Sequence, residues 1–441
     1  MNNLLISLAA VAVVLGVVVL VHEWGHFMAA KLFGVRVVVF SVGYGTRLFG
    51  WKKGDTDYRV SALPLGGYVR LAGDNPIEDR AGTPDEFLSR PRWQRVLIYC
   101  AGPFMNLVLA FVVATGIFLF LGLPVPEFMT QHATVVAVPT HSPAEKAGIK
   151  PGDQIASLNS IANPTWEQVS AFLAKLQPGS QVAFQVERAG QPVSLTTQVA
   201  EDDELEQTFG DPPLPTVISE VSAGMPADRA GLRADDKIVA IDGHPISTWP
   251  QMLELIKGSG GSVLHFTIER EGKQIELDIR PILSQNEAAQ TVYMIGALGI
   301  NPVIYRRLGT VEALREGGVS TIGMVGMVVG VVKQLITGKV SVRQLQSVVG
   351  IARESGQAAR RGFTDFVEWL AIISVNLGVL NLLPIPILDG GHILLLTIEG
   401  AMRRDISLAV KERIVQVGVV FLLVIFAIVM YNDVARVLPH H

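Results

Sequence analysis

The first residues whose types and spacing could carry chemistry lie near the N-terminus, where positions 22–26 read HEWGH. Side chains four residues apart lie on the same face of a helix, so His22 and His26 could bind one metal ion together. Glu23 would then lie beside a water molecule on that metal, where a carboxylate can act as general base. The spacing therefore predicts a divalent metal site with a hydrolytic base.

The surroundings of this stretch are strongly apolar. Residues 4–21 carry no charge, and the apolar character resumes over 27–33. Lys31 marks an interface nine residues after His22, which places His22 about 13 Å inside the boundary at the helical rise of 1.5 Å per residue. Ionisable groups inside a membrane span usually form a functional site. The alternative is a polar patch at a helix end that packs against neighbouring elements.

Catalytic zinc takes three protein ligands and leaves one position open, so a third ligand must come from elsewhere in the chain. The best candidate lies in residues 381–392, which read NLLPIPILDGGH. Two prolines break a helix there, and Asp389 follows in a Gly-rich turn without a nearby basic residue. His392 is a weaker candidate, and a helix-capping role is the alternative for Asp389.

Four stretches are long and apolar enough to be transmembrane helices. We predict these spans at about residues 4–33, 96–123, 366–383 and 414–430. A further apolar stretch at 319–332 is short for a span and fits an interfacial or re-entrant helix. The first span is expected to stay on the chain, because it lacks the basic start and the small-residue cleavage site of a signal peptide.

The distribution of basic residues predicts the orientation of these spans. Lysines and arginines are concentrated in residues 31–95 and 403–413, whereas the long 124–300 segment is acid-rich, with an acidic run that starts at 201. Both termini and the long segment are then expected outside, and the basic segments in the cytoplasm. With four spans, Asp389 lies on the same side as the two histidines. A fifth span would reverse its side, so the metal chemistry favours four.

The long segment contains an internal repeat. Residues 142–155 reappear as 224–238 with the pattern PAxxAG[IL] followed by DxI, and Trp166 is matched by Trp249 at the same offset. Short apolar runs separated by glycine and charged turns follow each copy, which indicates strands around a short helix. The two copies resemble tandem PDZ domains. Such a domain can add a peptide strand to its sheet edge, or serve as a spacer or sieve, and both roles stay open.

A third feature lies between the first two spans. Residues 57–71 predict two short strands around a Pro/Gly turn. A transmembrane substrate must be unwound before cleavage, and an exposed strand edge can satisfy its released backbone groups. We therefore predict Gly67, Tyr68 and Val69 as substrate contacts. The alternative is an ordinary cytoplasmic hairpin.

The composition excludes several classes of protein. Hydrophobic residues make up 49% of the 441 residues and charged residues 17%, while the net charge is only −4. This balance indicates a membrane protein with soluble parts, and nothing in it favours a nucleic-acid partner. The single cysteine, Cys100, cannot form an internal disulfide and fits a buried structural thiol.

The HEWGH stretch, the NLLPIPILDGG segment and the repeat between spans two and three together resemble the site-2 protease family of intramembrane zinc metalloproteases, over nearly the whole chain. The resemblance implies that His22, His26 and Asp389 bind zinc, that Glu23 is the general base, and that Asn381 contacts substrate or the transition state. It also implies a membrane-associated hairpin and a bacterial inner-membrane location. The implied substrates are single-span membrane proteins already trimmed outside, such as anti-sigma factors, and remnant signal peptides.

The expected fold class is a polytopic α-helical membrane protein with four transmembrane helices, two tandem PDZ domains inserted between spans two and three, and a membrane-associated β-hairpin. The expected divisions are 1–123 (N-terminal membrane part), 124–208 and 209–285 (PDZ domains), 286–365 (linker) and 366–441 (C-terminal membrane part). The sequence LQSVVGI at 345–351 departs from the family, whose members usually have LSGP before this point.

Two other functions compete with this interpretation. A catalytically silent PDZ scaffold or chaperone could keep a structural metal, but it would not need a base at Glu23. A metal transporter would be expected to carry ligands in several spans, and ionisable residues are otherwise scarce in these. The sequence does not predict the oligomeric state.

Overall fold

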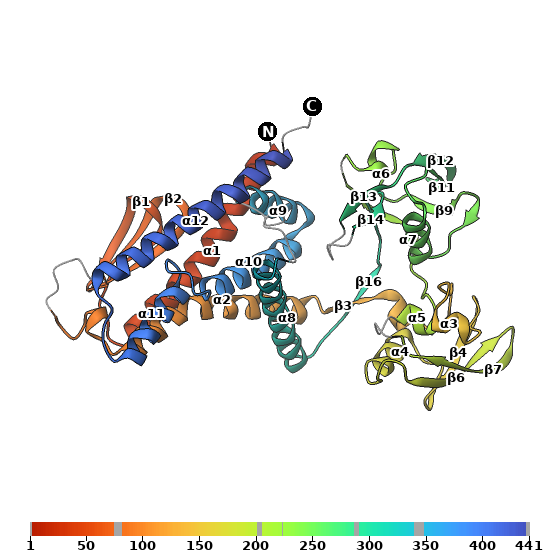
Figure 1. Ribbon diagram of the computed structural model, residues 1–441, viewed down its shortest axis with the longest axis horizontal. Helices are drawn as coiled ribbons and strands as arrows, with labels where there is room; N and C mark the ends of the chain where they lie inside the picture. The colour runs from red at the N-terminus through yellow and green to blue at the C-terminus, as the bar shows by residue number, and fades with distance from the viewer. Residues whose placement is uncertain are drawn as a thin grey trace. The chain divides into compact units, whose positions relative to one another are not determined.

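The computed structural model describes residues 2–74, 82–200, 205–222, 224–285, 291–338 and 348–437. The acidic residues 201–204, residues 345–347 of the family departure and the terminal residues His440 and His441 therefore lie outside the described residues. The chain forms two compact units, one made of residues 1–122 and 307–441 and the other of residues 123–306. The first unit is mainly helical and the second is rich in short strands (Figure 1).

The helices of the first unit pack around α2. Helix α2 contacts α1, α8, α10 and α11, and α1 also packs against α9 and the hairpin. The bounds in this unit are α1 Asn2–Leu32, η1 Phe87–Ser89, α2 Arg92–Phe120, α8 Thr310–Ile336, α9 Val348–Arg361, α10 Phe363–Asn381, α11 Asp389–Met402 and α12 Leu408–Val437. The helix α2 is thus the element against which the segments with the candidate metal ligands are assembled.

Small residues bring these helices close together. A side chain at Gly25 of α1 would overlap the carbonyl oxygen of Ala101 on α2, and a Cβ at Gly378 of α10 would lie 3.0 Å from the carbonyl oxygen of Pro103. Packing of this kind is typical of helices in membranes, where there is little hydrophobic force between helices and close contact supplies the attraction. The glycine inside the HEWGH stretch therefore has a packing role between α1 and α2.

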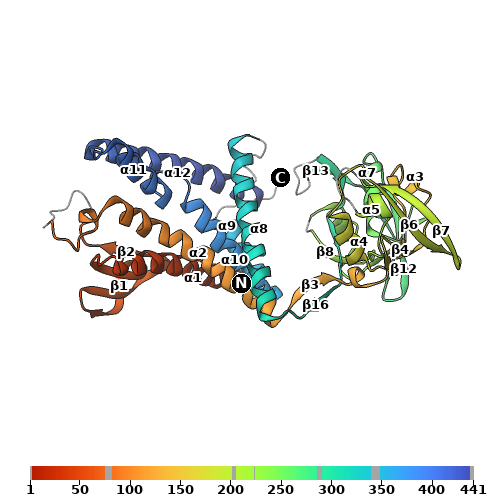
Figure 2. The same cartoon turned by 90° about the horizontal axis from the view of Figure 1, so that it is seen from below.

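In the described part of the chain, helices that are long and apolar enough to cross a membrane cover residues 4–32, 92–120, 310–335 and 363–381. The first, second and fourth coincide with three expected spans, and the expected span at 414–430 falls inside α12. The stretch expected as a short interfacial helix belongs to α8, which is longer than the sequence pattern indicated. Figures 1 and 2 show α8 crossing α2 instead of running alongside it. Length and apolar composition alone therefore do not decide whether α8 crosses the membrane, and the number of spans stays a prediction.

The hairpin between α1 and α2 consists of β1 Val37–Lys53 and β2 Thr56–Leu71, paired antiparallel. The stretch 57–71, predicted as two strands around a turn, is therefore one bent strand, and its pairing partner lies upstream in β1. Phe40 of β1 pairs with Tyr58 on one side and with Val69 on the other, so the two halves of β2 flank the first half of β1. Gly66, with φ +118°, allows the bend between these halves. The stretch around Val69 consequently forms an edge of the sheet.

The second unit contains two four-stranded sheets with the same internal order. These are β5-β4-β6-β7 and β10-β9-β11-β12. The bounds are β3 Leu123–Pro126, η2 Glu127–Thr130, α3 Pro143–Lys146, β4 Gln154–Leu158, β5 Ile161–Ala162, α4 Trp166–Leu173, β6 Gln181–Arg188, β7 Gln191–Gln198, α5 Leu205–Phe209, β8 Ile218–Val221, α6 Pro226–Arg229, β9 Lys237–Ile241, β10 His244–Pro245, α7 Trp249–Gly258, β11 Leu264–Arg270, β12 Lys273–Ile279, β13 Ile282–Gln285, β14 Thr291–Met294, β15 Ala297–Gly299 and β16 Val303–Arg306.

Pairing outside these sheets ties the ends of the unit together. Each four-stranded sheet with its helices is called a module here, the first built on β4–β7 and the second on β9–β12. The strand β15 pairs with β8, and Ile295 packs in the hydrophobic core of the second module, so residues beyond 285 contribute to the unit. The entering strand β3 pairs with the leaving strand β16, with Leu123 opposite Arg306. The finer domain division stays a prediction.

The repeated aspartates have the same structural role in both modules. Asp153 is fully buried and accepts hydrogen bonds from Arg188 at 2.6 and 2.7 Å. Asp236 is equally buried and accepts from Arg270, with both distances 2.6 Å. Each carboxylate also accepts a backbone N–H three residues upstream. A buried charge needs this degree of compensation, which explains why the DxI element recurs.

A third buried carboxylate, Asp211, links the two modules. Its backbone bridges to Ala137, and its Oδ2 accepts a hydrogen bond from the hydroxyl of Thr248 at 3.0 Å. The residue is 2% exposed, and within the described residues its Oδ1 has no hydrogen-bond partner. Burial raises the pKa of this carboxyl to about 6, and the carboxylates of Glu206 and Glu254 add to the rise.

The raised pKa of Asp211 predicts a pH-dependent stability of the second unit. The folded protein holds a proton on Asp211 up to about pH 6, whereas an unfolded aspartate loses it near 3.9, so this group's contribution to stability falls as pH rises through that window. Asp211→Asn removes the charge and keeps an acceptor for Thr248. We expect this variant to raise the free energy of unfolding by about 1–3 kcal/mol at pH 8, and by much less at pH 4.5.

Pulse proteolysis of the full chain in detergent at the two pH values measures this difference. Asp235→Asn is the matched control, because Asp235 is exposed and its positive φ suits asparagine. An equal effect of Asp211→Asn at both pH values would contradict the assignment.

Candidate metal centre

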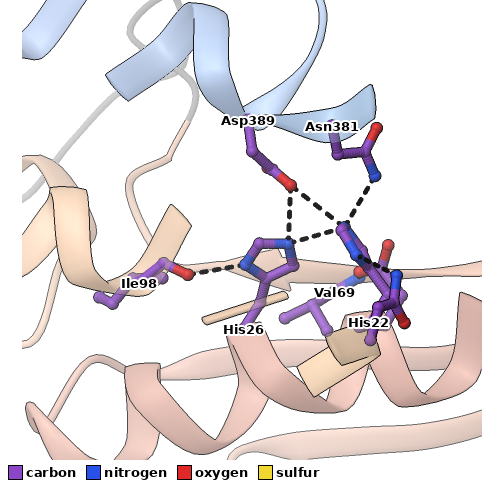
Figure 3. A network of polar contacts seen from close by, with 8 residues as sticks. His22, His26, Val69, Ile98, Asn381 and Asp389 are labelled. Carbon is purple, nitrogen blue, oxygen red and sulfur yellow. Dashed lines mark hydrogen bonds and ion pairs between the residues drawn. The ribbon is translucent and has the colours of Figure 1, made fainter. Parts of the chain in front are cut away.

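Two imidazoles and one carboxylate converge beside α2. The Nε2 atoms of His22 and His26 lie 3.2 Å apart, and Asp389 Oδ2 lies 3.1 Å from the first and 3.5 Å from the second. Figure 3 shows the two rings of α1 and the carboxylate at the start of α11 pointing toward one another. His22 is 5% exposed, so the group is largely shielded from solvent.

The distances between these atoms fit a tetrahedral zinc ion. Bonds of about 2.0–2.2 Å from zinc to nitrogen or oxygen make the edges of such a tetrahedron roughly 3.3–3.6 Å long. The three observed separations, 3.1, 3.2 and 3.5 Å, lie close to this length. Two imidazoles and a carboxylate are also a usual ligand set of catalytic zinc, and they leave one position free.

One face of α2 supports both imidazoles. The carbonyl oxygen of Ile98 lies 2.7 Å from His26 Nδ1, and the side-chain amide of Asn106 lies 3.2 Å from His22 Nδ1. Midway between them, a Cβ at Gly102 would overlap His26 Nε2 and lie 2.9 Å from His22 Nε2. Residues 98, 102 and 106 are four apart, so this single helical face holds the rings and leaves room for the ion.

The position of Asp389 follows from the loop that precedes it. The helix α10 ends at Asn381, and the prolines that follow prevent its continuation before α11 begins at Asp389. Side chains at Gly390 and Gly391 would overlap the backbone carbonyls of Leu382 and Ile385. The two glycines therefore let the first turn of α11 pack onto the loop, and a helix N-terminus favours the carboxylate there.

Glu23 is held by the hairpin edge. The backbone N–H of Val69 donates a hydrogen bond to Glu23 Oε2 at 2.9 Å. A carboxylate that accepts such a bond has a fixed orientation, which suits a group that must take a proton from a defined direction. The hairpin thus contributes to the arrangement of the centre as well as bordering it.

A cavity of about 410 Å³ contains the centre. The eight site residues expected from the sequence all line it: His22, Glu23, His26, Gly67, Tyr68, Val69, Asn381 and Asp389. The amide nitrogen of Asn381 lies 3.3 Å from His22 Nε2, and Phe87 and Tyr99 extend the cavity. The rival ligand His392 lies outside the ligand group and stacks on Tyr99 instead, with ring centroids 4.8 Å apart.

The supporting face on α2 is only weakly indicated by the sequence pattern. The stretch GPFMN at 102–106 also resembles the site-2 protease family, but this resemblance gives no role to Gly102 or Asn106. The contribution of Ile98 is a backbone carbonyl that no side-chain pattern can reveal. A signal was nevertheless present, because an asparagine in the middle of an apolar span is costly unless it has a partner.

A comparison with protein-family models matches residues 10–425 to peptidase family M50. The chain therefore belongs to this family, which is the site-2 protease family, and zinc is confirmed as the expected cofactor. A regulator of sigma-E protease, RseP, from Salmonella typhimurium is 31% identical over 99% of this chain and all of that protein. RseP from Escherichia coli K12 is 30% identical over the same shares. A Neisseria meningitidis protein that carries the name of a zinc metalloprotease is 32% identical over 96% of this chain and 97% of its own length.

The packing of Gly102 predicts that Gly102→Ala weakens zinc binding by at least about tenfold, because the added methyl group occupies the space of the ligand nitrogens. The metal content of the purified protein and its zinc affinity in a chelator competition measure this change. Gly116→Ala on the same helix is the matched control, since a Cβ there meets nothing within 4 Å. Equal zinc affinity of both variants would show that Gly102 does not border the metal.

Proposed function

We propose that this chain is an intramembrane zinc metalloprotease that hydrolyses peptide bonds within or beside the transmembrane segments of single-span proteins. The observation that carries the proposal is the meeting of four groups in one cavity: the imidazoles of His22 and His26, the carboxylate of Asp389, and Glu23 beside them. Membership of a peptidase family supports hydrolysis as the reaction.

Zinc in such a site acts as a Lewis acid that lowers the pKa of water and polarises a carbonyl group. The residues of the chain supply the proton transfers. Glu23 takes a proton from the attacking water and later gives it to the leaving amine, so that no net proton is consumed. The N–H of Val69 keeps the Glu23 carboxylate turned toward the cavity. The amide of Asn381 can donate a hydrogen bond to the carbonyl oxygen as negative charge develops on it.

The hairpin edge would hold the substrate in extended form. In a strand, the N–H and C=O of one residue point to the same edge and those of the next residue to the other. The outward N–H of Val69 thus indicates that the backbone groups of Gly67 also face the cavity, while Tyr68 pairs with Ser41 of β1. An unwound transmembrane segment needs such partners, because the membrane interior offers no water to satisfy its backbone.

The remaining assignments also belong to this proposal. Four spans carry the chain through a bacterial inner membrane, with the metal centre toward the cytoplasmic side and the second unit in the periplasm. The two modules of the second unit are tandem PDZ domains, and both peptide capture and size filtering remain open for them. The relatives named as regulators of sigma-E protease favour anti-sigma factors as a substrate class. A silent PDZ scaffold remains the competing function.

Glu23→Gln separates the protease from the scaffold. We expect this variant to bind zinc like the wild type and to cleave a pre-trimmed single-span reporter about 100- to 10,000-fold more slowly, because the amide cannot accept the proton. Reconstituted vesicles with the reporter, together with measured zinc content, provide the test. Equal cleavage by the two proteins would remove the enzymatic function.

Val69→Pro tests the hairpin edge. Proline removes the N–H that donates a hydrogen bond to Glu23, so the carboxylate loses its fixed orientation. We therefore expect cleavage to slow roughly 10- to 100-fold with zinc content unchanged. Val69→Ala shortens the side chain but keeps the N–H, and it should therefore stay near the wild-type rate. If alanine slows cleavage as much as proline does, the side chain and not the backbone of Val69 is what matters.

A further inference from the structure

Asn106 is a buried polar residue in the middle of α2 whose side chain faces the metal centre. It is fully buried, and its amide nitrogen lies 3.2 Å from His22 Nδ1. Its backbone carbonyl accepts a hydrogen bond from the hydroxyl of Ser374 on α10 at 2.8 Å. Its Oδ1 has no hydrogen-bond partner within the part of the chain that the structure describes. A buried acceptor without a donor is costly, so this oxygen calls for a physical explanation.

The direction of the His22 ring provides the explanation. Its Nε2 faces Asp389 and the Nε2 of His26, so this nitrogen is the one that can bind the ion. A neutral imidazole that binds metal through Nε2 carries its hydrogen on Nδ1, and this N–H requires an acceptor. For His26 the carbonyl oxygen of Ile98 meets the requirement at 2.7 Å.

The side-chain amide of Asn106 is the group that lies next to Nδ1 of His22. The amide nitrogen can only donate a hydrogen bond, whereas the amide oxygen can accept one from the Nδ1 hydrogen. A half-turn about the Cβ–Cγ bond exchanges the two atoms and leaves the volume of the side chain unchanged. In that orientation Oδ1 receives the N–H of His22, so the hydrogen bond between the two side chains has a donor and an acceptor.

We infer that Asn106 is a positioning residue, which accepts the Nδ1 hydrogen of His22 through Oδ1 and thereby fixes the tautomer that presents Nε2 to zinc. The inference rests on the proposed function and deepens its metal site. An amide suits this position better than a carboxylate would, because it supplies an acceptor without placing another charge inside a membrane span. The face of α2 then has two acceptors, at 98 and 106, on either side of Gly102.

Zinc affinity of the purified full-length protein in detergent, measured by competition with a chromogenic chelator, tests the inference. Asn106→Leu keeps a similar volume but removes the acceptor, so we expect zinc binding about 10- to 100-fold weaker. Asn106→Asp keeps an acceptor at the same place and should bind zinc within about threefold of the wild type or more tightly. This order, with aspartate above leucine, is specific to an acceptor role.

Ser374→Ala is the matched control, because it removes a buried hydrogen bond to the same asparagine without touching the ring. Its zinc affinity should stay near the wild type. Cobalt substitution adds a spectroscopic readout, since the visible absorption of bound cobalt reports the ligand geometry, which should change in Asn106→Leu and persist in Asn106→Asp.

Wild-type affinity in Asn106→Leu, or equal losses in the aspartate and leucine variants, would overturn the inference. A loss in Ser374→Ala as large as that in Asn106→Leu would overturn it as well, because loosened packing would then explain both. A different outcome separates the two proposals. If the zinc affinities of the Asn106 variants follow the expected order but the protein does not cleave the reporter, the proposed protease function is refuted and the role of Asn106 stands.

Discussion

The whole first unit depends on one constraint, which is that ionisable groups inside an apolar helix must be compensated where they lie. The histidines of α1 meet this constraint through Asp389 on one side and through α2 on the other. The close contacts of α2 with α1 at Gly25, and with α10 at Gly378, bring these partners within reach. Packing and metal chemistry are therefore inseparable here, because the same close contacts that hold the helices together also bring the ligands together.

The hairpin joins this arrangement from a different direction. Its edge borders the cavity and donates the N–H of Val69 to Glu23, so one element both lines the proposed substrate site and orients the carboxylate proposed as the base. An exposed strand edge usually pairs with another strand. Here one of its backbone N–H groups, that of Val69, donates to the carboxylate of Glu23 instead. Binding of an extended peptide along this edge would consequently be coupled to the orientation of Glu23.

The sequence predicted the site better than the fold around it. HEWGH and the late NLLPIPILDGG segment contain the candidate metal ligands and Glu23, because ligand spacing and helix-breaking prolines leave direct traces in a sequence. The crossing of α8 over α2, and the way β2 flanks β1, left no such trace. Both depend on contacts between segments far apart in the chain, such as Gly317 with Thr115, which only the folded structure brings together. The carbonyl of Ile98 was unpredictable for the same reason.

The pairing of β3 with β16 has a consequence for how such a chain can be built. Leu123 lies opposite Arg306, so the polypeptide leaves the helical unit and returns to it through two adjacent strands. Everything between them is a cassette with neighbouring ends. A cassette of this kind can be lengthened, shortened or exchanged during evolution without altering the spacing of the segments that carry the ligands. The strand pair thus allows the length of the second unit to change without moving the ends of the chain at the helical unit apart.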